Sequence, residues 1–146
     1  MFRFETEVDK ARRILLGQRL KDTNTERSSA LRALRGTPDE QEQPLHVWAL
    51  DDRGGLAGGL TGRTWASWLH VDLLWVDAAH RGAGLGAELL ARAEESARTD
   101  RASAWSRVET WDFQAPDFYR KQGYEVVGEV PEYPPGITEF TLVKRL

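Results

Sequence analysis

Hydrophobic and polar residues alternate in several segments of the chain and recur at helical spacing in others, which predicts a mixed α/β protein. Phe2 to Val8 alternates apolar and polar residues, and this pattern predicts a short first strand. Asp9 is a candidate cap for a helix that ends near Leu20, and the polar run 23–26 precedes a second helix that reaches Leu34. The N-terminal part is therefore expected to form one strand and two helices.

The rest of the chain predicts six further strands and two further helices, separated by glycine- and proline-containing turns. The expected strands are Leu45–Leu50, Leu56–Thr64, Trp68–Val76, Trp105–Trp111, Tyr124–Val130 and Ile137–Val143. The expected helices are Leu85–Glu94, with its apolar residues on one face, and Ala115–Gln122, which Gly123 ends.

Composition narrows the class of protein to one globular domain over residues 1–146. Hydrophobic residues make up 40% and aromatic residues 10%, which is too apolar for a disordered chain. The absence of cysteine excludes thiol nucleophiles, disulfides and cysteine-based zinc sites. The chain starts without an apolar signal core, and no apolar run approaches the ~18 residues of a membrane span. We therefore expect a cytoplasmic protein without a membrane partner.

Charge and histidine spacing argue against two further classes of partner. The formal net charge of −3 gives no general attraction to nucleic acid. His46, His70 and His80 are not at metal-ligand spacing, so we expect no metal site. His70 is a weak candidate for a catalytic histidine, and a histidine bonded within the sheet explains it better.

The segment from Val76 to Gly86 has the pattern of an anion-binding loop, because a strand leads in and an amphipathic helix leads out. Backbone amides of the glycines and the positive end of the helix dipole would together hold a pyrophosphate. A nucleotide P-loop is excluded because Ala87-Glu88 follows the last glycine. The letters 82–87 fit a dinucleotide-binding fingerprint, with Glu109 downstream, but the first glycine lies too far from the strand. An ordinary flexible loop is the remaining alternative.

Two motifs carry a resemblance to a known family. Arg81-Gly82-Ala83-Gly84-Leu85-Gly86 matches an acetyltransferase loop, and residues 115–124 match a pattern in which alanine, tyrosine and glycine recur every four residues before an aromatic residue. With the strand 72–76 before the loop, the chain resembles the GNAT N-acetyltransferase superfamily. The resemblance implies an α/β (α+β) fold: a mixed, mostly antiparallel sheet of about seven strands, with parallel splayed strands four and five and helices on both faces. It also implies acetyl transfer from acetyl-CoA to a primary amine.

The resemblance assigns candidate roles to individual residues. Tyr119 lies where the family places a tyrosine facing the coenzyme sulfur, as a general acid, and a core tyrosine is the alternative. Asp72 is the candidate base, and a sheet aspartate paired with an arginine is its alternative. Gln114 would replace a family asparagine, because that asparagine's position holds Asp112. The candidate acetyl-CoA-binding residues are Leu74, Trp75, Val76, Arg81, Gly82, Ala83, Gly84, Leu85, Gly86 and Gln114.

The acceptor is expected to be a small-molecule amine. Six tryptophans are available to pack the core or to line a wall for a cationic acceptor. Asp72, Asp112, Glu132 and Tyr133 are expected near the acceptor end, and Trp65 and Trp68 are expected to pair their indoles across a tight hairpin. A non-catalytic acyl-CoA sensor or interaction module is the alternative to an enzyme. The sequence leaves open whether the chain is a homodimer.

Overall fold

The computed structural model describes residues 1–114 and 116–146 and divides into two compact units, residues 1–38 and 39–146. Among the described residues, no helix combines the length and the apolar character needed to cross a membrane. The expected helix 115–122 begins at Ala115, which lies outside the described residues, and is observed from Pro116.

The first unit contains α1 (Lys10–Arg27) and α2 (Ser29–Leu34). Asp9 caps α1 as expected, because its side chain accepts a hydrogen bond from the Arg12 amide. The first helix runs past the expected end at Leu20, and Ser28 both ends it and caps α2. Phe2 to Val8 is exposed and forms no strand, so the sheet has six strands rather than about seven.

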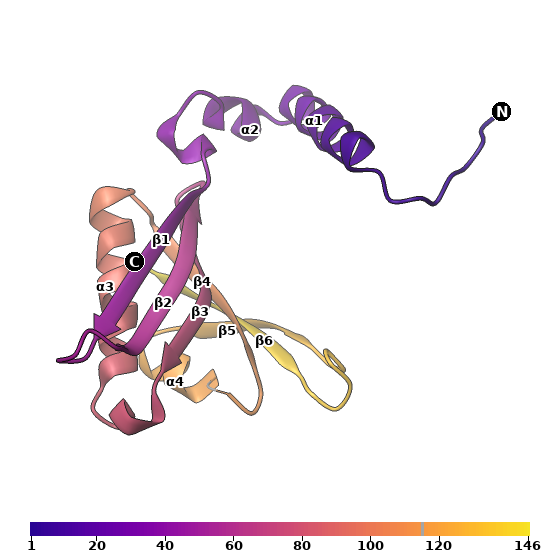
Figure 1. The fold of residues 1–146 in the computed structure, drawn as a ribbon. Helices are drawn as coiled ribbons and strands as arrows, with labels where there is room; N and C mark the ends of the chain where they lie inside the picture. The colour runs from indigo at the N-terminus through magenta and orange to yellow at the C-terminus, as the bar shows by residue number, and fades with distance from the viewer. Residues whose placement is uncertain (115) are drawn as a thin grey trace. The chain divides into compact units, whose positions relative to one another are not determined.

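The second unit contains one mixed sheet with the strand order β1-β2-β3-β4-β6-β5 (Figure 1). All neighbours are antiparallel except β3 and β4, which are parallel, as the resemblance implied. The strands are β1 (Gln43–Leu50), β2 (Leu56–Trp65), β3 (Trp68–Val76), β4 (Trp105–Trp111), β5 (Glu125–Val130) and β6 (Glu139–Arg145). The helices are α3 (Leu85–Asp100) and α4 (Pro116–Lys121), with a short 3-10 turn η2 (Ala78–His80). A further 3-10 turn, η1 (Pro38–Glu40), spans the boundary between the two units.

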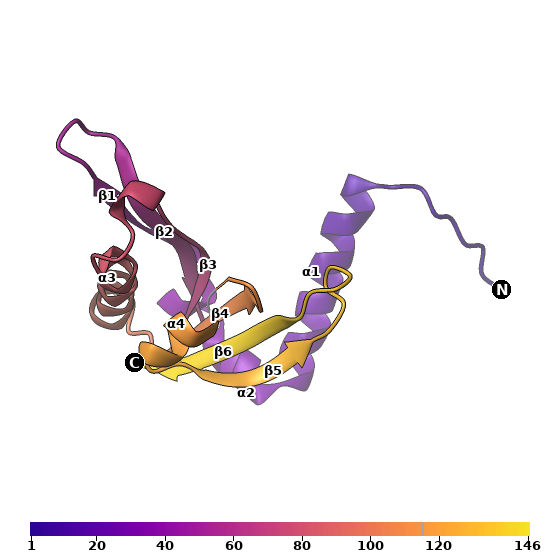
Figure 2. The same cartoon turned by 90° about the horizontal axis from the view of Figure 1, so that it is seen from below.

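The parallel strands β3 and β4 pair over only half their length. Their register runs from Trp68 opposite Trp105 to Val71 opposite Val108 and then stops. Beyond that point β3 and β4 diverge, with β1 and β2 following one and β6 and β5 the other (Figure 2). The splay expected between the fourth and fifth strands is therefore present, between the strands now numbered β3 and β4.

A β-bulge marks the place where the two strands separate. Against β2, Val71 pairs with Gly62 and Leu73 pairs with Thr61, so Asp72 is an extra residue on β3. The bulge shifts the alternation of β3, because Val71 faces the core before it and Leu74 packs on the core after it. Gly62 must be glycine here, since an added Cβ would lie 2.5 Å from the His70 carbonyl oxygen.

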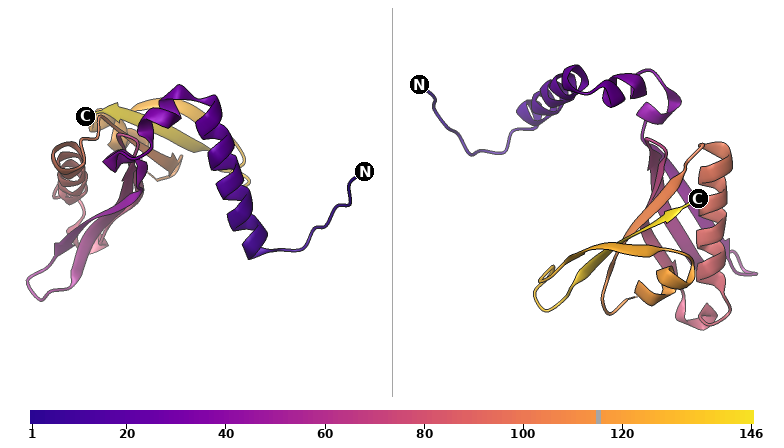
Figure 3. Two further views of the ribbon diagram at one scale, coloured as in Figure 1. Left: turned by 90° about the horizontal axis from the view of Figure 1, so that it is seen from above. Right: turned by 180° about the vertical axis from the view of Figure 1, so that it is seen from behind.

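The core of this unit lies on one face of the sheet. Leu89, Leu90, Ala93 and Ala97 recur at helical spacing and bury one side of α3 against β1, β2 and β3. Tyr119 brings α4 into the same core, and both helices are seen together in Figure 3. Both helices of this unit thus contribute to one core.

The hairpin between β2 and β3 corrects one expectation about the tryptophans. Ala66 and Ser67 both have positive φ, as a two-residue hairpin turn of the primed type requires. Trp65 and Trp68 are register partners, but the indole of Trp68 stacks on Trp105, with ring centroids 5.5 Å apart. The indole N–H of Trp65 instead donates to the Glu40 carbonyl. The stacked pair therefore joins the two parallel strands rather than the hairpin.

Candidate active site

The loop between β3 and α3 is shaped by two glycines. Gly82 and Gly84 have φ of +84° and +79°, in the left-handed region that side chains disfavour, and no atom lies near either glycine where a Cβ would stand. Gly84 caps α3 without a side-chain hydrogen bond. The amides of the first turn of a helix have no acceptor within the helix, so this end of α3 offers donors and a positive dipole to an anion.

The loop opens onto a cavity of about 620 Å³, which we call the loop cavity. Of the ten residues that the resemblance assigns to acetyl-CoA, nine line it and Ala83 does not. Arg81 donates from Nε to the Val76 carbonyl over 3.1 Å, so its guanidinium is tied to the end of β3. The lining residues are Leu74, Trp75, Val76, His80, Arg81, Gly82, Gly84, Leu85, Gly86, Ala87, Gln114, Phe118, Tyr119 and Gln122.

Tyr119 is the buried member of this lining, with 6% of its surface exposed. Its ring makes edge contacts with Phe118 and Tyr124, at centroid distances of 5.1 and 5.6 Å. Burial raises the pKa of Tyr119 to about 12. Within residues 1–114 and 116–146 its hydroxyl has no hydrogen-bond partner. The phenol is therefore protonated near neutral pH and able to donate to a ligand.

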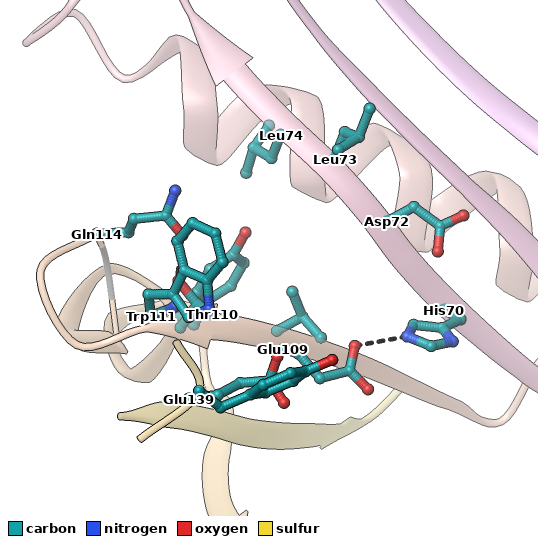
Figure 4. Close-up of a pocket in the computed structure, with 12 residues that line it drawn as sticks. His70, Asp72, Leu73, Leu74, Glu109, Thr110, Trp111, Gln114 and Glu139 are labelled. Carbon is teal, nitrogen blue, oxygen red and sulfur yellow. Dashed lines mark hydrogen bonds and ion pairs between the residues drawn. The ribbon is translucent and has the colours of Figure 1, made fainter. Parts of the chain in front are cut away.

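A second cavity of about 700 Å³ lies where β3 and β4 diverge, and we call it the sheet cavity (Figure 4). Leu74, Gln114 and Tyr119 line both cavities, so the two meet at these residues. Asp72 lines only the sheet cavity. The other residues of its lining are His70, Leu73, Val108, Glu109, Thr110, Trp111, Tyr133 and Glu139.

Ion pairs and hydrogen bonds tie up most charged groups of the sheet cavity. Arg63 donates from Nη1 to Asp72 Oδ1 and from Nη2 to His70 Nδ1, the latter over 2.8 Å. Because arginine can only donate, Nδ1 accepts and the proton of His70 lies on Nε2, which donates to Glu109 Oε2 over 2.7 Å (Figure 4). Arg107 donates to the other oxygen of Glu109, also over 2.8 Å.

The partners of Glu109 control its ionisation. Burial by itself raises the pKa of Glu109, but the hydrogen bonds and charges of His70 and Arg107 outweigh it and hold the pKa below the ordinary value of 4.5. Glu109 is therefore an ionised carboxylate and a weak base. Both ring nitrogens of His70 are already engaged, which agrees with the sheet histidine that the sequence favoured.

The sequence placed four residues at the acceptor end, and two of them line the sheet cavity: Asp72 and Tyr133. Asp112 instead closes the turn after β4, because its carboxylate accepts from the Thr138 amide over 3.0 Å. Glu132 accepts from the Gly136 amide within its own loop. Within the ranges that the structure describes, no three acidic or histidine side chains are grouped to hold a metal ion.

Glu139 is a lining residue that the sequence did not single out. It begins β6 and lies opposite Trp111 in the β4–β6 register, on the same face as Glu109 and its register partner Thr141. The alternation of Glu139, Thr141 and Val143 against core-facing Leu142 was the available signal. That alternation predicts which side chains of β6 share a face, but it does not predict which other strand lies beside them. It therefore could not have indicated a cavity.

Residues 9–124 match the sequence profile of the acetyltransferase (GNAT) family. The chain belongs to the GNAT family. It is an enzyme of the N-acetyltransferase type, as the glycine loop, the splayed parallel strands and the tyrosine of α4 together predict.

Known relatives of this GNAT chain are themselves described as acetyltransferases. Blasticidin-S acetyltransferase of Streptomyces morookaense is 57% identical over 131 residues, covering 88% of this chain and 96% of the relative. A crystal structure of an acetyltransferase from Bacillus cereus is 26% identical, with a TM-score of 0.84 over 99% of this chain and 98% of that one. A Bacillus anthracis protein assigned as a streptothricin acetyltransferase, crystallised with acetyl coenzyme A, is 18% identical (TM-score 0.64, covering 79% and 67%) and shares the fold.

Proposed function

We propose that this chain transfers the acetyl group of acetyl-CoA to a primary amine of a small molecule, and that an antibiotic such as blasticidin S is its acceptor. The observation that carries the proposal is the meeting of the two cavities at Leu74, Gln114 and Tyr119. An acyl donor in one and an amine in the other would react at that junction. The 57% identity to a blasticidin-S acetyltransferase supports this class of acceptor.

The loop cavity fits the proposed cosubstrate. The open left-handed glycines and the free end of α3 suit a pyrophosphate, and the exposed edge of β3 from Leu74 to Val76 suits an extended amide-containing arm. When bound there, acetyl-CoA would supply the acetyl thioester. In the overall reaction the carbon–sulfur bond breaks, a carbon–nitrogen bond forms, the amine loses a proton and the sulfur leaves as a thiolate.

Tyr119 is proposed to stabilise the leaving sulfur. A phenol whose pKa is about 12 is a weaker acid than a thiol of pKa ~8.5, so complete proton transfer to the thiolate is uphill. Donation of a hydrogen bond requires no such transfer, and it is stronger in a buried site than in water. The general-acid role that the resemblance assigned to Tyr119 is thus replaced by the role of a hydrogen-bond donor, with the amine or solvent supplying the final proton.

Asp72 is proposed to accept the amine proton, directly or through water. Arg63 bonds one oxygen of its carboxylate, and the second oxygen keeps its acceptor capacity. The bulge places Asp72 on the face that lines the sheet cavity, a few residues before Leu74 at the junction. His70 is the weaker candidate, because Arg63 and Glu109 occupy its two nitrogens.

We further propose that residues 1–146 act as one N-acetyltransferase domain, since the family match spans the boundary between the two units. A cytoplasmic location is proposed because acetyl-CoA, the cosubstrate, is an intracellular metabolite.

The decisive test is release of coenzyme A from acetyl-CoA in the presence of blasticidin S and a panel of polyamines, aminoglycosides, amino acids and peptides. We expect turnover with blasticidin S, a product heavier by one acetyl group, and only slow hydrolysis without acceptor. Turnover with peptides alone would show that the acceptor is a peptide and not a small molecule. Binding of acetyl-CoA without turnover on any amine would instead favour the non-catalytic sensor.

A further inference from the structure

Three carboxylates line the sheet cavity, and they differ in what they contact. Asp72 is bonded by Arg63, and Glu109 is bonded by His70 and Arg107. The carboxylate of Glu139 has no hydrogen bond or ion pair with any of the residues that the structure describes. It is half-buried, so its charge is partly removed from water without a protein cation in return. An unpaired, partly desolvated carboxylate is the group in this cavity best suited to receive a cation from outside.

The surroundings of Glu139 are aromatic. Trp111 lies directly opposite it in the antiparallel register, at the spacing where side chains on one face touch. Trp111 is 37% exposed and packs at 5.7 Å against the ring of Phe113. Tyr133 comes from the loop between β5 and β6, is 59% exposed and lines the same cavity. Aromatic faces beside a carboxylate attract a cation more strongly than either group alone.

We infer that Glu139, Trp111 and Tyr133 form a subsite for a second cationic group of the acceptor, separate from the amine that is acetylated. The reacting amine belongs at the junction with the loop cavity, near Leu74 and Tyr119. Glu139 lies at the start of β6, opposite Trp111 at the end of β4, and does not line the loop cavity. The inference rests on the proposed function and specifies its substrate class: a small molecule with a primary amine at one end and a cation at the other.

Two amines of similar length separate this subsite from the chemistry. Agmatine carries a primary amine and a guanidinium, whereas hexylamine carries the amine alone. Wild type is expected to acetylate agmatine with a KM about ten- to a hundredfold below that for hexylamine, because a charge-assisted contact is added. Glu139→Gln is expected to remove that difference by raising the KM for agmatine, with kcat nearly unchanged and hexylamine unaffected.

Two further variants control the result. Glu129→Gln removes the same charge from an exposed residue of β5 that lines neither cavity and pairs with Phe140, next to Glu139. It is expected to leave the KM for agmatine unchanged. Tyr133→Ala removes a largely exposed ring and is expected to raise that KM several-fold. A fall of kcat for both amines in Glu139→Gln would overturn the subsite and make Glu139 a base.

Calorimetry with the coenzyme A-bound protein measures the binding of amines to the subsite without any turnover. Agmatine is expected to bind more tightly than hexylamine to wild type, and Glu139→Gln is expected to abolish the difference. If no amine is acetylated but this binding pattern holds, the subsite stands and the proposed function fails. If amines are acetylated but wild type and Glu139→Gln treat agmatine alike, the subsite is overturned and the proposed function stands.

Discussion

The loop cavity and the sheet cavity share three residues but are built in different ways. Backbone conformation shapes the loop cavity, through two left-handed glycines and the first turn of α3. Side chains from three strands shape most of the sheet cavity, and hydrogen bonds and ion pairs with arginine and with one another fix three of them, His70, Asp72 and Glu109. A cavity shaped by the backbone, such as the loop cavity, suits a cosubstrate that stays the same. The shape and charge of the sheet cavity, in contrast, can be altered by replacing a single side chain. With the donor and the acceptor assigned to the two cavities as proposed above, binding of the donor and choice of the acceptor can vary independently.

The largest effect is expected from a change in the loop cavity. Gly84→Asp adds a carboxylate and a Cβ at a φ of +79°, where a pyrophosphate would lie, so acetyl-CoA affinity should fall by about a hundredfold or more. Titration calorimetry measures the affinity. Gly54→Asp is the matched control, because Gly54 has the same φ and equally open space but lines neither cavity. Unchanged affinity in Gly84→Asp would mean that the coenzyme binds elsewhere.

The next effect concerns the junction of the two cavities. Tyr119→Phe keeps the ring packing and removes the hydroxyl, so turnover should fall by about ten- to a thousandfold. Acetyl-CoA affinity should change little, because the glycine loop is untouched. Since the pKa of Tyr119 is about 12, its loss should not alter the pH–rate profile below about pH 10. Steady-state kinetics across pH tests all three points.

Tyr124→Phe is the control for that experiment. Tyr124 is also buried, but its hydroxyl bonds Ser106 and Glu94 inside the core and it lines neither cavity. We expect Tyr124→Phe to lose stability, by about 1 kcal/mol, and to keep its turnover. If Tyr119→Phe and Tyr124→Phe lost turnover equally, the proposed catalytic role of the Tyr119 hydroxyl would be wrong.

A smaller effect is expected inside the sheet cavity from Asp72→Asn. The amide cannot accept the amine proton, so turnover should fall by about tenfold and the acidic limb of the pH–rate profile should disappear. Stopped assays over a range of pH measure both. Normal turnover with an intact acidic limb would mean that water, and not Asp72, accepts the proton of the amine. In that case Asp72 serves only to hold Arg63.

The smallest effect concerns stability rather than turnover. The pKa of Glu109 is held below 4.5, so its ionised form stabilises the fold above that pH, and this contribution is lost as the pH falls through the lowered value. Glu109→Gln should lower the unfolding free energy by on the order of 1 kcal/mol near neutral pH. The difference in unfolding free energy between Glu109→Gln and wild type should become smaller below about pH 4.5, and urea unfolding measures it. The same change at exposed Glu125 should produce no such narrowing.

The sequence predicted those features that depend on local pattern. The cap at Asp9, the glycine loop before α3 and the parallel pair β3 and β4 follow from residues close in sequence or from the family motif. Phe2 to Val8 shows why alternation alone is insufficient. It reports amphipathicity, but a strand exists only where a neighbouring backbone accepts its hydrogen bonds.

Long-range register accounts for what the sequence could not supply. The indole partner of Trp68 is Trp105, which only the parallel pairing brings beside it. Glu139 meets Trp111 only through the antiparallel pairing of β4 with β6. Asp112 was expected near the acceptor, yet the amide of Thr138 claims its carboxylate. The acceptor side of the site thus depends on strand registers that single residues do not encode.

The glycine opposite the bulge limits how this enzyme can diversify. Gly62 lines neither cavity, yet any side chain there would press on the His70 carbonyl and displace the segment that carries His70 and Asp72. Descendants that acquire new acceptors can exchange the side chains around the sheet cavity one at a time. Gly62 cannot be replaced in the same stepwise way, because any side chain there would displace the bulge. A library randomised at this position and selected for acetyltransferase activity should return glycine alone, although Gly62 lines neither cavity.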